Sequence, residues 1–206
     1  MKEQELDSER QYAALAGTYD LKTRFIAGIR QRAIAALRLQ PGETVLDAGC
    51  GTGWCLPMLS FGVQQGGHVI GFEASPDMLA LAHVRVVNQN LANVELLKSL
   101  GETVVLGRAP DAILFSYTHD LIRSRASLKN IFCQAKSGTR IVAVSTKLFP
   151  KWFFVGNWYL RKTHQLTITN FDGFDRPWTL LAELTAAYSV RTTLPGSRYL
   201  FAGRLP

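Results

Sequence analysis

The stretch of this sequence that decides the fold is Val45-Leu46-Asp47-Ala48-Gly49-Cys50-Gly51-Thr52-Gly53-Trp54. An apolar strand runs directly into three alternating glycines, and glycine has no Cβ that would hold the backbone away from a ligand. Two kinds of nucleotide-binding loop follow a strand and open a helix in this way, so the glycine spacing has to distinguish them. The dinucleotide fingerprint requires glycines at positions 49, 51 and 54, but position 54 is Trp. The spacing therefore disfavours a nicotinamide cofactor.

The loop resembles motif I of the class I S-adenosylmethionine-dependent methyltransferases, whose Gly-x-Gly-x-Gly spacing matches Gly49, Gly51 and Gly53. The resemblance implies that Asp47 and the glycine loop, with Cys50 inside it, surround the methionine end of S-adenosylmethionine. S-adenosylhomocysteine is then the product.

A second signal lies 20 residues after Gly53, where the short apolar run 68–73 ends in Glu73. A carboxylate at the C-terminal end of a second strand can accept hydrogen bonds from two ribose hydroxyls. By the same resemblance, Ala74 follows along the cofactor and Met78 lies against the adenine. Packing in a helix core is an equally good interpretation of Met78.

The adenine end of the expected site is completed by residues that follow the third strand. The resemblance implies that Ser99 and Leu100 face the adenine, although Ser99 stands where many relatives have an acid. We also expect Ser116, at the end of the fourth strand, to contact the cofactor.

Strands and helices alternate along the chain, a pattern that places helices on both faces of a mostly parallel sheet. Strands are expected at 44–48, 68–73, 94–98, 111–117 and 139–145, and helices at 21–39, from 55 onward, at 76–90 and at 121–135. The segment between the third and fourth strands is short and rich in glycine, so we expect a turn there instead of a helix.

The end of the chain tests the fold independently. The runs 188–194 and 197–203 are rich in β-forming residues, and Pro195-Gly196 separates them, which predicts a hairpin. This hairpin agrees with the fold that the resemblance implies. The predicted fold class is α/β: a Rossmann-like methyltransferase fold with a mostly parallel seven-stranded sheet, a C-terminal antiparallel hairpin and helices on both faces.

Length and composition are those of one globular domain, with 206 residues and 47% hydrophobic content. Within residues 1–206 we interpret 1–40 as an N-terminal helical cap and 147–176 as a lid that supplies the acceptor pocket. Residues 1–11 are too charged for a signal peptide, and no apolar run approaches the roughly 18 residues of a membrane span. Three cysteines without a CxxC pair favour a reduced, cytoplasmic protein without a metal site.

Charge is distributed unevenly. Residues 1–120 carry 10 Lys+Arg and 13 Asp+Glu, a net charge of −3, whereas residues 121–206 carry 13 and 3, a net charge of +10. The C-terminal part therefore favours an anionic partner, such as an acidic small molecule, a phospholipid surface or nucleic acid. A solvated basic face is the alternative.

Ligands of open α/β sheets bind beyond the carboxyl ends of the strands, where the strand order reverses. The resemblance puts that point between the first and fourth strands, so the loop 117–120 belongs to the site. His119 is the best candidate for a general base, and Tyr117 is a second catalytic candidate. Asp120 is either a partner of His119 or a helix cap, and His119 as an exposed loop residue remains an equal alternative.

The segment before the first helix also resembles family members, in which a Tyr-Asp pair closes over the cofactor. The resemblance implies that the hydroxyl of Tyr19 touches the methionine carboxylate, although Tyr19 could instead anchor the helix. Tyr12 is a candidate for the substrate pocket.

Residues 147–162 are an aromatic cluster framed by basic residues. We expect Trp152, Phe153 and Trp158 to line an apolar acceptor pocket, whose π faces would favour a cationic amine or the sulfonium. The same composition suits a segment that lies in a membrane interface. We prefer the pocket, and a peripheral contact with an anionic membrane is the alternative.

The sequence thus predicts methyl transfer to a nitrogen or oxygen of a small molecule or lipid head group by in-line displacement. Tyr-Asp before the first helix, Ser-Tyr after the fourth strand and Arg-Pro-Trp before the last helix loosely resemble bacterial enzymes that N-methylate lipid head groups. This resemblance implies an amphiphilic acceptor. An RNA-modifying methyltransferase is less consistent, because the fourth strand ends in Phe-Ser-Tyr-Thr and lacks the Asn/Asp-Pro-Pro-aromatic signature. A non-catalytic cofactor-binding subunit is a further alternative, and the oligomeric state stays open.

Overall fold

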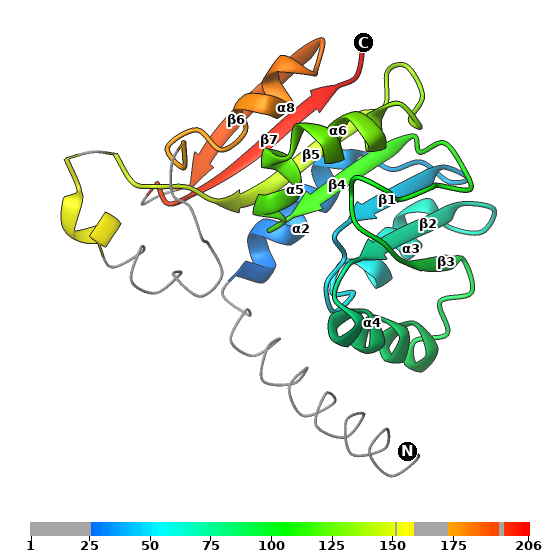
Figure 1. Ribbon diagram of the computed structural model, residues 1–206. Coiled ribbons are helices and arrows are strands. Elements are labelled where there is room, and N and C mark those ends of the chain that lie inside the picture. Colours follow the sequence, from blue (N-terminus) through cyan, green and yellow to red (C-terminus); the bar gives the residue numbers. More distant parts are fainter. Residues whose placement is uncertain (1–25, 151, 159–172, 194–195) are drawn as a thin grey trace.

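The computed structural model describes residues 26–150, 152–158, 173–193 and 196–206 (Figure 1). Within these residues seven strands form one sheet in the order β3-β2-β1-β4-β5-β7-β6. The strands are β1 (Thr44–Ala48), β2 (His68–Glu73), β3 (Val94–Lys98), β4 (Ala112–Ser116), β5 (Arg140–Thr146), β6 (Ala187–Thr193) and β7 (Arg198–Arg204).

Strands β1 to β5 pair in parallel, and β7 is antiparallel to both of its neighbours, β5 and β6. The chain moves outward from β1 to β3 and then returns to the other side of β1 with β4, so the strand order reverses between β1 and β4. The predicted Rossmann-like fold with a C-terminal hairpin is therefore confirmed, including its reversal point.

Helices cover both faces of the sheet (Figure 1). One face packs against α2 (Ala27–Leu37), α3 (Leu56–Val63) and α4 (Pro76–Asn88). The other packs against α5 (His119–Arg123), α6 (Arg125–Phe132) and α8 (Thr179–Glu183). The strands alternate between the two cores: Leu46 and Ala48 belong to the α5–α6 side, and Val45 belongs to the α2–α3 side.

The predicted helix 121–135 is wrong in one respect, because the structure divides it into α5 and α6. Ser124 lies between them in an extended conformation, with φ −90° and ψ 108°. Its Oγ accepts a hydrogen bond of 3.1 Å from the backbone N–H of Ser127. Ser124 is therefore the N-cap of a new helix and interrupts the predicted one.

The segment between β3 and β4 contains turns, as predicted. Two of its residues, Val104 and Leu106, are buried in the core between the sheet and helices α5 and α6. Two amides of α6 and the turn after it hold this segment: Asn130 Nδ2 donates to the carbonyl oxygens of Gly101 and Val104, at 3.0 and 2.9 Å, and Gln134 Nε2 donates to Val104 O at 2.9 Å. The loop that begins at Ser99 is thereby fixed beside β2.

Several predictions lie outside the described residues. These include Tyr12, Tyr19 and most of the expected N-terminal cap, together with residues 159–172 of the expected lid. In the part of the chain that the structure describes, no helix has the length and apolar character needed to cross a membrane.

Candidate active site

Two adjoining cavities lie at the carboxyl ends of β1, β2 and β4. The smaller, of about 240 Å³, follows the glycine loop, and the larger, of about 600 Å³, runs from the end of β2 toward the end of β5. Residues that line both cavities are Arg30, Gly49, Glu73, Tyr117 and Thr118. The two cavities therefore form one site at the predicted reversal of strand order.

A third cavity of about 1090 Å³ is larger, but it lies on the face of the sheet between α2 and β6–β7. Its charged lining residues are Arg32, Arg38, Arg140, Arg191 and Arg204. It contains no carboxylate that could bind ribose hydroxyls, and it is away from the carboxyl ends of the parallel strands. The two smaller cavities are therefore the candidate cofactor site.

The three loop glycines all have positive φ angles but have different roles. Gly51, with φ +55°, has open space within 4 Å of the position where a Cβ would stand, and it lines the smaller cavity. At Gly49 a Cβ would lie 2.6 Å from Thr118 Cγ2, so this glycine lets the start of α5 approach the loop. Gly53 lines neither cavity; its missing Cβ makes room for Leu56 and for Ala82 of α4.

Glu73 connects the end of β2 to the glycine loop. Its Oε2 accepts a hydrogen bond of 3.0 Å from the backbone N–H of Gly51, and its Oε1 accepts one of 2.9 Å from Ser75 N. A carboxylate has about four acceptor positions. Each oxygen therefore keeps one for a ligand hydroxyl, and the carboxylate lines both cavities.

Asp47 is 1% exposed, and neither carboxylate oxygen has a hydrogen-bond partner among the described residues. Burial raises the pKa of Asp47 to about 7, and the charge of Glu73 adds to the increase, while the nearby charge of Arg30 opposes it. Such an unpaired carboxylate is costly without a ligand. A cationic group in the smaller cavity would supply the missing partner.

Arg30 of α2 is a site residue that the sequence interpretation missed. Its side chain is buried, with the guanidinium carbon 5.2 Å from the ring centroid of Trp54 and 5.3 Å from that of Tyr117. A signal was present, since Ile26, Arg30, Ala33 and Leu37 follow the spacing of one helix face, and all four are buried. The arginine thus points into the site from an otherwise apolar face.

Tyr117 and His119 follow β4 and line the larger cavity. Tyr117 has a φ of +61°, which is rare for a side chain of its size and is the kind of strain found at functional sites. Its hydroxyl is buried without a partner among the described residues, and burial raises the pKa of Tyr117 to about 12. The hydroxyl therefore stays protonated at neutral pH.

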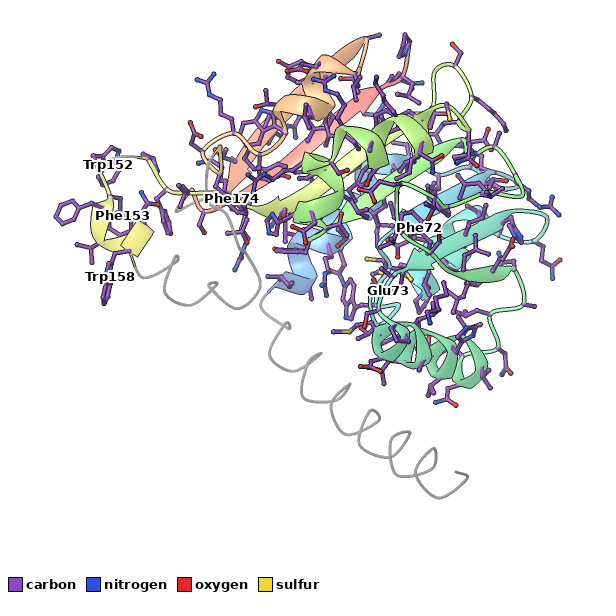
Figure 2. All side chains as sticks on the ribbon, viewed as in Figure 1. Phe72, Glu73, Trp152, Phe153, Trp158 and Phe174 are labelled. Carbon is purple, nitrogen blue, oxygen red and sulfur yellow. The ribbon has the colours of Figure 1, made fainter. Side chains whose placement is uncertain are left out.

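His119 is the first residue of α5. Its Nε2 lies 2.9 Å and its Nδ1 3.2 Å from Ser145 Oγ, and its ring centroid lies 4.8 Å from that of the buried Phe174. Phe174 is at the end of the sheet, separate from Glu73 (Figure 2). His119 also lines the larger cavity, whereas the N-cap of α5 is Thr118 and not Asp120.

Other predicted cofactor residues also line the site. Ala74, Ser99 and Leu100 line the larger cavity, while Cys50, Met78 and Ser116 line the smaller one. Ser99 Oγ donates to Leu100 O at 3.1 Å. Burial raises the pKa of the Cys50 thiol, so this side chain is a neutral part of the wall.

The predicted aromatic pocket residues are not part of these walls. Trp152, Phe153 and Trp158 line neither cavity, and Figure 2 shows them on a segment that extends away from the sheet, far from Glu73.

The unpaired polar atoms provide a test of which ligand fits. Six of the seven buried side-chain nitrogen and oxygen atoms that lack a partner in the described structure belong to residues lining the smaller cavity: Arg30 Nε, both Asp47 oxygens, Ser116 Oγ, Tyr117 Oη and Thr118 Oγ1. The methionine end of S-adenosylmethionine carries an ammonium and a carboxylate, and its ribose carries two hydroxyls. The carboxylate of Asp47, the guanidinium of Arg30 and the nearby hydroxyls can pair with these ammonium, carboxylate and hydroxyl groups of the ligand.

The fold is that of a class I S-adenosylmethionine-dependent methyltransferase, whose cofactor is S-adenosylmethionine. A family model described as Protein-L-isoaspartate(D-aspartate) O-methyltransferase matches residues 25–146, and the chain belongs to this family. The matched region ends with β5, so it includes the cofactor half of the site.

Curated relatives are methyltransferases with several acceptors. The chain is 27% identical over 176 residues to a demethylmenaquinone methyltransferase of Lactiplantibacillus plantarum, and the match covers 78% of this chain and 70% of the relative. It is 31% identical over 105 residues to an aklanonic acid methyltransferase of a Streptomyces species, covering 50% and 48%. An arsenite methyltransferase of Halobacterium salinarum is 40% identical over 81 residues, covering 39% and 19%. The chain thus spans less than two thirds of the length of two of these three relatives.

Solved structures support the fold. A SAM-dependent methyltransferase from Aquifex aeolicus superposes with a TM-score of 0.62 at 21% identity, covering 86% of this chain and 89% of that one. The DhpI–SAH complex gives 0.62 at 21% identity, covering 97% and 96%. A methyltransferase in complex with the Haloferax volcanii Trm112 activator gives 0.68 at 13% identity, covering 97% of both chains.

Proposed function

We propose that the protein transfers the methyl group of S-adenosylmethionine to a nitrogen or oxygen atom of a small, partly apolar acceptor. The observation that carries this proposal is the joined pair of cavities, in which Glu73 and Asp47 stand at one end and His119 at the other. Relatives named for demethylmenaquinone and aklanonic acid support a small-molecule acceptor.

The acceptor end of the larger cavity combines apolar walls with a few polar groups. Ile26 and Leu121 supply apolar surface, while Thr146 and Arg198 supply a hydroxyl and a cation near Tyr117. Pockets of this composition orient a small ligand through few polar contacts. An acceptor with an apolar body and an oxygen-bearing or acidic edge fits these walls.

When bound, S-adenosylmethionine supplies a methyl group on an activated sulfonium, so the transfer needs positioning more than it needs chemical activation. Glu73 would hold the ribose hydroxyls, and Asp47 would accept hydrogen bonds from the ammonium. Arg30 and the hydroxyl of Tyr117 would donate toward the carboxylate of the methionine end. The burial of Asp47 and Arg30 helps to keep water away from this end of the cofactor.

His119 is the proposed general base for an acceptor that carries a proton at working pH. If Ser145 Oγ accepts a hydrogen bond from the N–H of the neutral imidazole, the other ring nitrogen carries the lone pair that would take the proton. The contact with Phe174 helps fix the orientation of the ring. Tyr117, whose pKa is about 12, would act as a hydrogen-bond donor and not as the base.

Calorimetry with S-adenosylmethionine, S-adenosylhomocysteine and NAD tests the cofactor half of the proposal. We expect both sulfur ligands to bind and NAD to bind poorly; tight NAD binding without binding of either sulfur ligand would overturn it. Transfer of a tritiated methyl group to a panel containing a hydroquinone, a phenolic acid, an ethanolamine phospholipid and an isoaspartyl peptide tests the acceptor half. Labelling of the isoaspartyl peptide alone would contradict a small-molecule acceptor.

A further inference from the structure

Residues 152–158 form an exposed apolar surface, which we call the aromatic protrusion. Trp152 is 78% exposed, Phe154 73% and Trp158 63%, and Phe153 and Val155 are also exposed. Five of the eleven large hydrophobic residues exposed in the described parts of the chain lie within these seven positions. The others are scattered singly or in small groups on other elements, so the protrusion is a concentrated feature of the surface.

The protrusion has an internal structure that keeps these side chains outward. The side chain of Asn157 bonds the backbone of Phe149 twice, since its Oδ1 accepts from Phe149 N at 2.8 Å and its Nδ2 donates to Phe149 O at 3.2 Å. The ring of Phe153 packs edge-on against that of Phe149, with centroids 5.1 Å apart, and over Gly156, where a Cβ would collide with it. Phe153 therefore forms the inner side of the turn.

Trp152, Phe154 and Trp158 are the most exposed large apolar side chains of the turn. Figure 2 shows Trp152 and Trp158 on a segment that extends beyond the end of the sheet. The turn lines neither site cavity. In this arrangement it presents tryptophan and phenylalanine to the surroundings and does not cover the cofactor site.

The composition of the neighbouring sequence indicates the partner. Between residues 147 and 162 the chain carries Lys147, Lys151, Arg161 and Lys162 and no acidic residue. Tryptophan and phenylalanine next to lysine and arginine, without acids, suit the interface of an anionic bilayer, where rings enter the head-group layer and cations meet phosphates.

We infer that the aromatic protrusion docks the protein onto the surface of an anionic phospholipid bilayer. Trp152, Phe154 and Trp158 enter the interfacial layer, and the net positive charge of the surrounding sequence favours an anionic bilayer. The inference concerns membrane contact alone, and it holds or fails independently of the methyl acceptor.

Sedimentation with vesicles tests this inference on the full chain without cofactor. We expect the protein to sediment with phosphatidylcholine vesicles that contain phosphatidylglycerol, and less with phosphatidylcholine alone. Raising the salt concentration from roughly 0.1 M to 1 M should weaken sedimentation, because the screening length falls from about 10 to about 3 Å. The tryptophan emission should shift to shorter wavelength on binding.

The double variant Trp152→Ala/Trp158→Ala should partition at least about tenfold more weakly. Phe61→Ala is the matched control, since Phe61 is an exposed aromatic residue of α3 outside the protrusion, and it should bind like the wild type. Circular dichroism and binding of S-adenosylhomocysteine confirm that each variant is folded. Failure of the folded wild type to bind anionic vesicles would overturn the inference, as would equal binding by the double variant. A dimer that the double substitution converts to a monomer, seen by sedimentation velocity without vesicle binding, would assign the protrusion to self-association instead.

Discussion

The carboxylate of Glu73 accepts a hydrogen bond of 3.0 Å from the backbone N–H of Gly51, and this bond joins the end of β2 to the loop that follows β1. The residue that would hold the ribose also holds the glycine loop in place. We therefore expect cofactor affinity and loop conformation to be coupled through one side chain.

We predict that Glu73→Ala weakens binding of S-adenosylhomocysteine by about 1 to 3 kcal/mol, because hydrogen bonds to ligand hydroxyls and to the loop are lost. Calorimetry measures the change. Glu95→Ala is the control, since Glu95 pairs with His68 on the same half of the sheet but outside both cavities. Unchanged affinity in a folded Glu73→Ala protein would move the ribose site elsewhere.

Comparing substitutions of Gly51 and Gly42 distinguishes the loss of space for the ligand from the strain of a positive φ angle. Gly51→Ala should cost about 1 to 2 kcal/mol of stability for its positive φ, and it should also weaken cofactor binding because the new methyl group enters the smaller cavity. Gly42→Ala has a similar conformational cost, with φ +85° and open space, but it lies in the turn before β1. Thermal unfolding and calorimetry should therefore show comparable destabilisation but loss of affinity only for Gly51→Ala.

The raised pKa of Asp47 predicts opposite effects of pH on stability and on binding. The folded protein keeps a proton on Asp47 up to about pH 7, whereas the unfolded chain loses it near 3.8. The contribution of Asp47 to stability is therefore lost as the pH rises through about 7. Cofactor affinity should increase over the same range, because the ionised carboxylate accepts hydrogen bonds from the ligand ammonium. Calorimetry at several pH values tests this, and Asp47→Asn should remove the dependence.

Arg30→Met should move the midpoint of this pH dependence of cofactor binding to a higher pH. The positive charge of Arg30 lowers the pKa of Asp47, so its removal should raise the midpoint for cofactor binding above 7 and weaken binding at neutral pH. Arg32→Met is the matched control on the exposed side of the same helix, outside the cofactor site. A midpoint shared by the Arg30→Met variant and the wild type would show that the two charges are not coupled.

The pH dependence of methyl transfer should distinguish the role of His119 as the general base from that of Tyr117 as a hydrogen-bond donor. With the acceptor that the labelled panel identifies, His119→Gln should lower kcat by about 10² or more and remove the low-pH limb of the profile. Tyr117→Phe should lower kcat but keep that limb, because the pKa of Tyr117 is about 12. His83→Gln, an exposed change on α4, is the control. An unaltered limb in His119→Gln would exclude His119 as the base.

Local sequence patterns predicted the framework well where turns bound the strands. The limits of β1, β2 and β3 agree with the prediction, because each is a short apolar run ended by glycine, a helix cap or a polar turn. The break at Ser124 was missed because a serine within an apolar periodic stretch resembles an ordinary helical residue until its hydroxyl is seen to cap the next turn.

The site was predicted less completely because part of it depends on contacts between distant segments. Arg30 is recognised as a site residue only when Trp54 and Tyr117 are seen around its side chain. Trp152 is exposed on a turn that Asn157 closes through two bonds to Phe149, and hydrophobic composition does not specify that turn. The composition of residues 147–162 indicated an unusual segment. It did not indicate whether the aromatic side chains face a pocket or the surroundings.

The position of β7 has a consequence for the order of events during synthesis. Residues 198–204 leave the ribosome after β6, yet they must enter the sheet between β5 and β6 and bring the buried Tyr199 and Phe201 into the core. Until then β5 has a free edge, which can pair with other chains. A nascent or prematurely terminated chain without Arg198–Arg204 therefore carries a nearly complete cofactor site on an unfinished sheet, and it would be a substrate for chaperones before it became an enzyme.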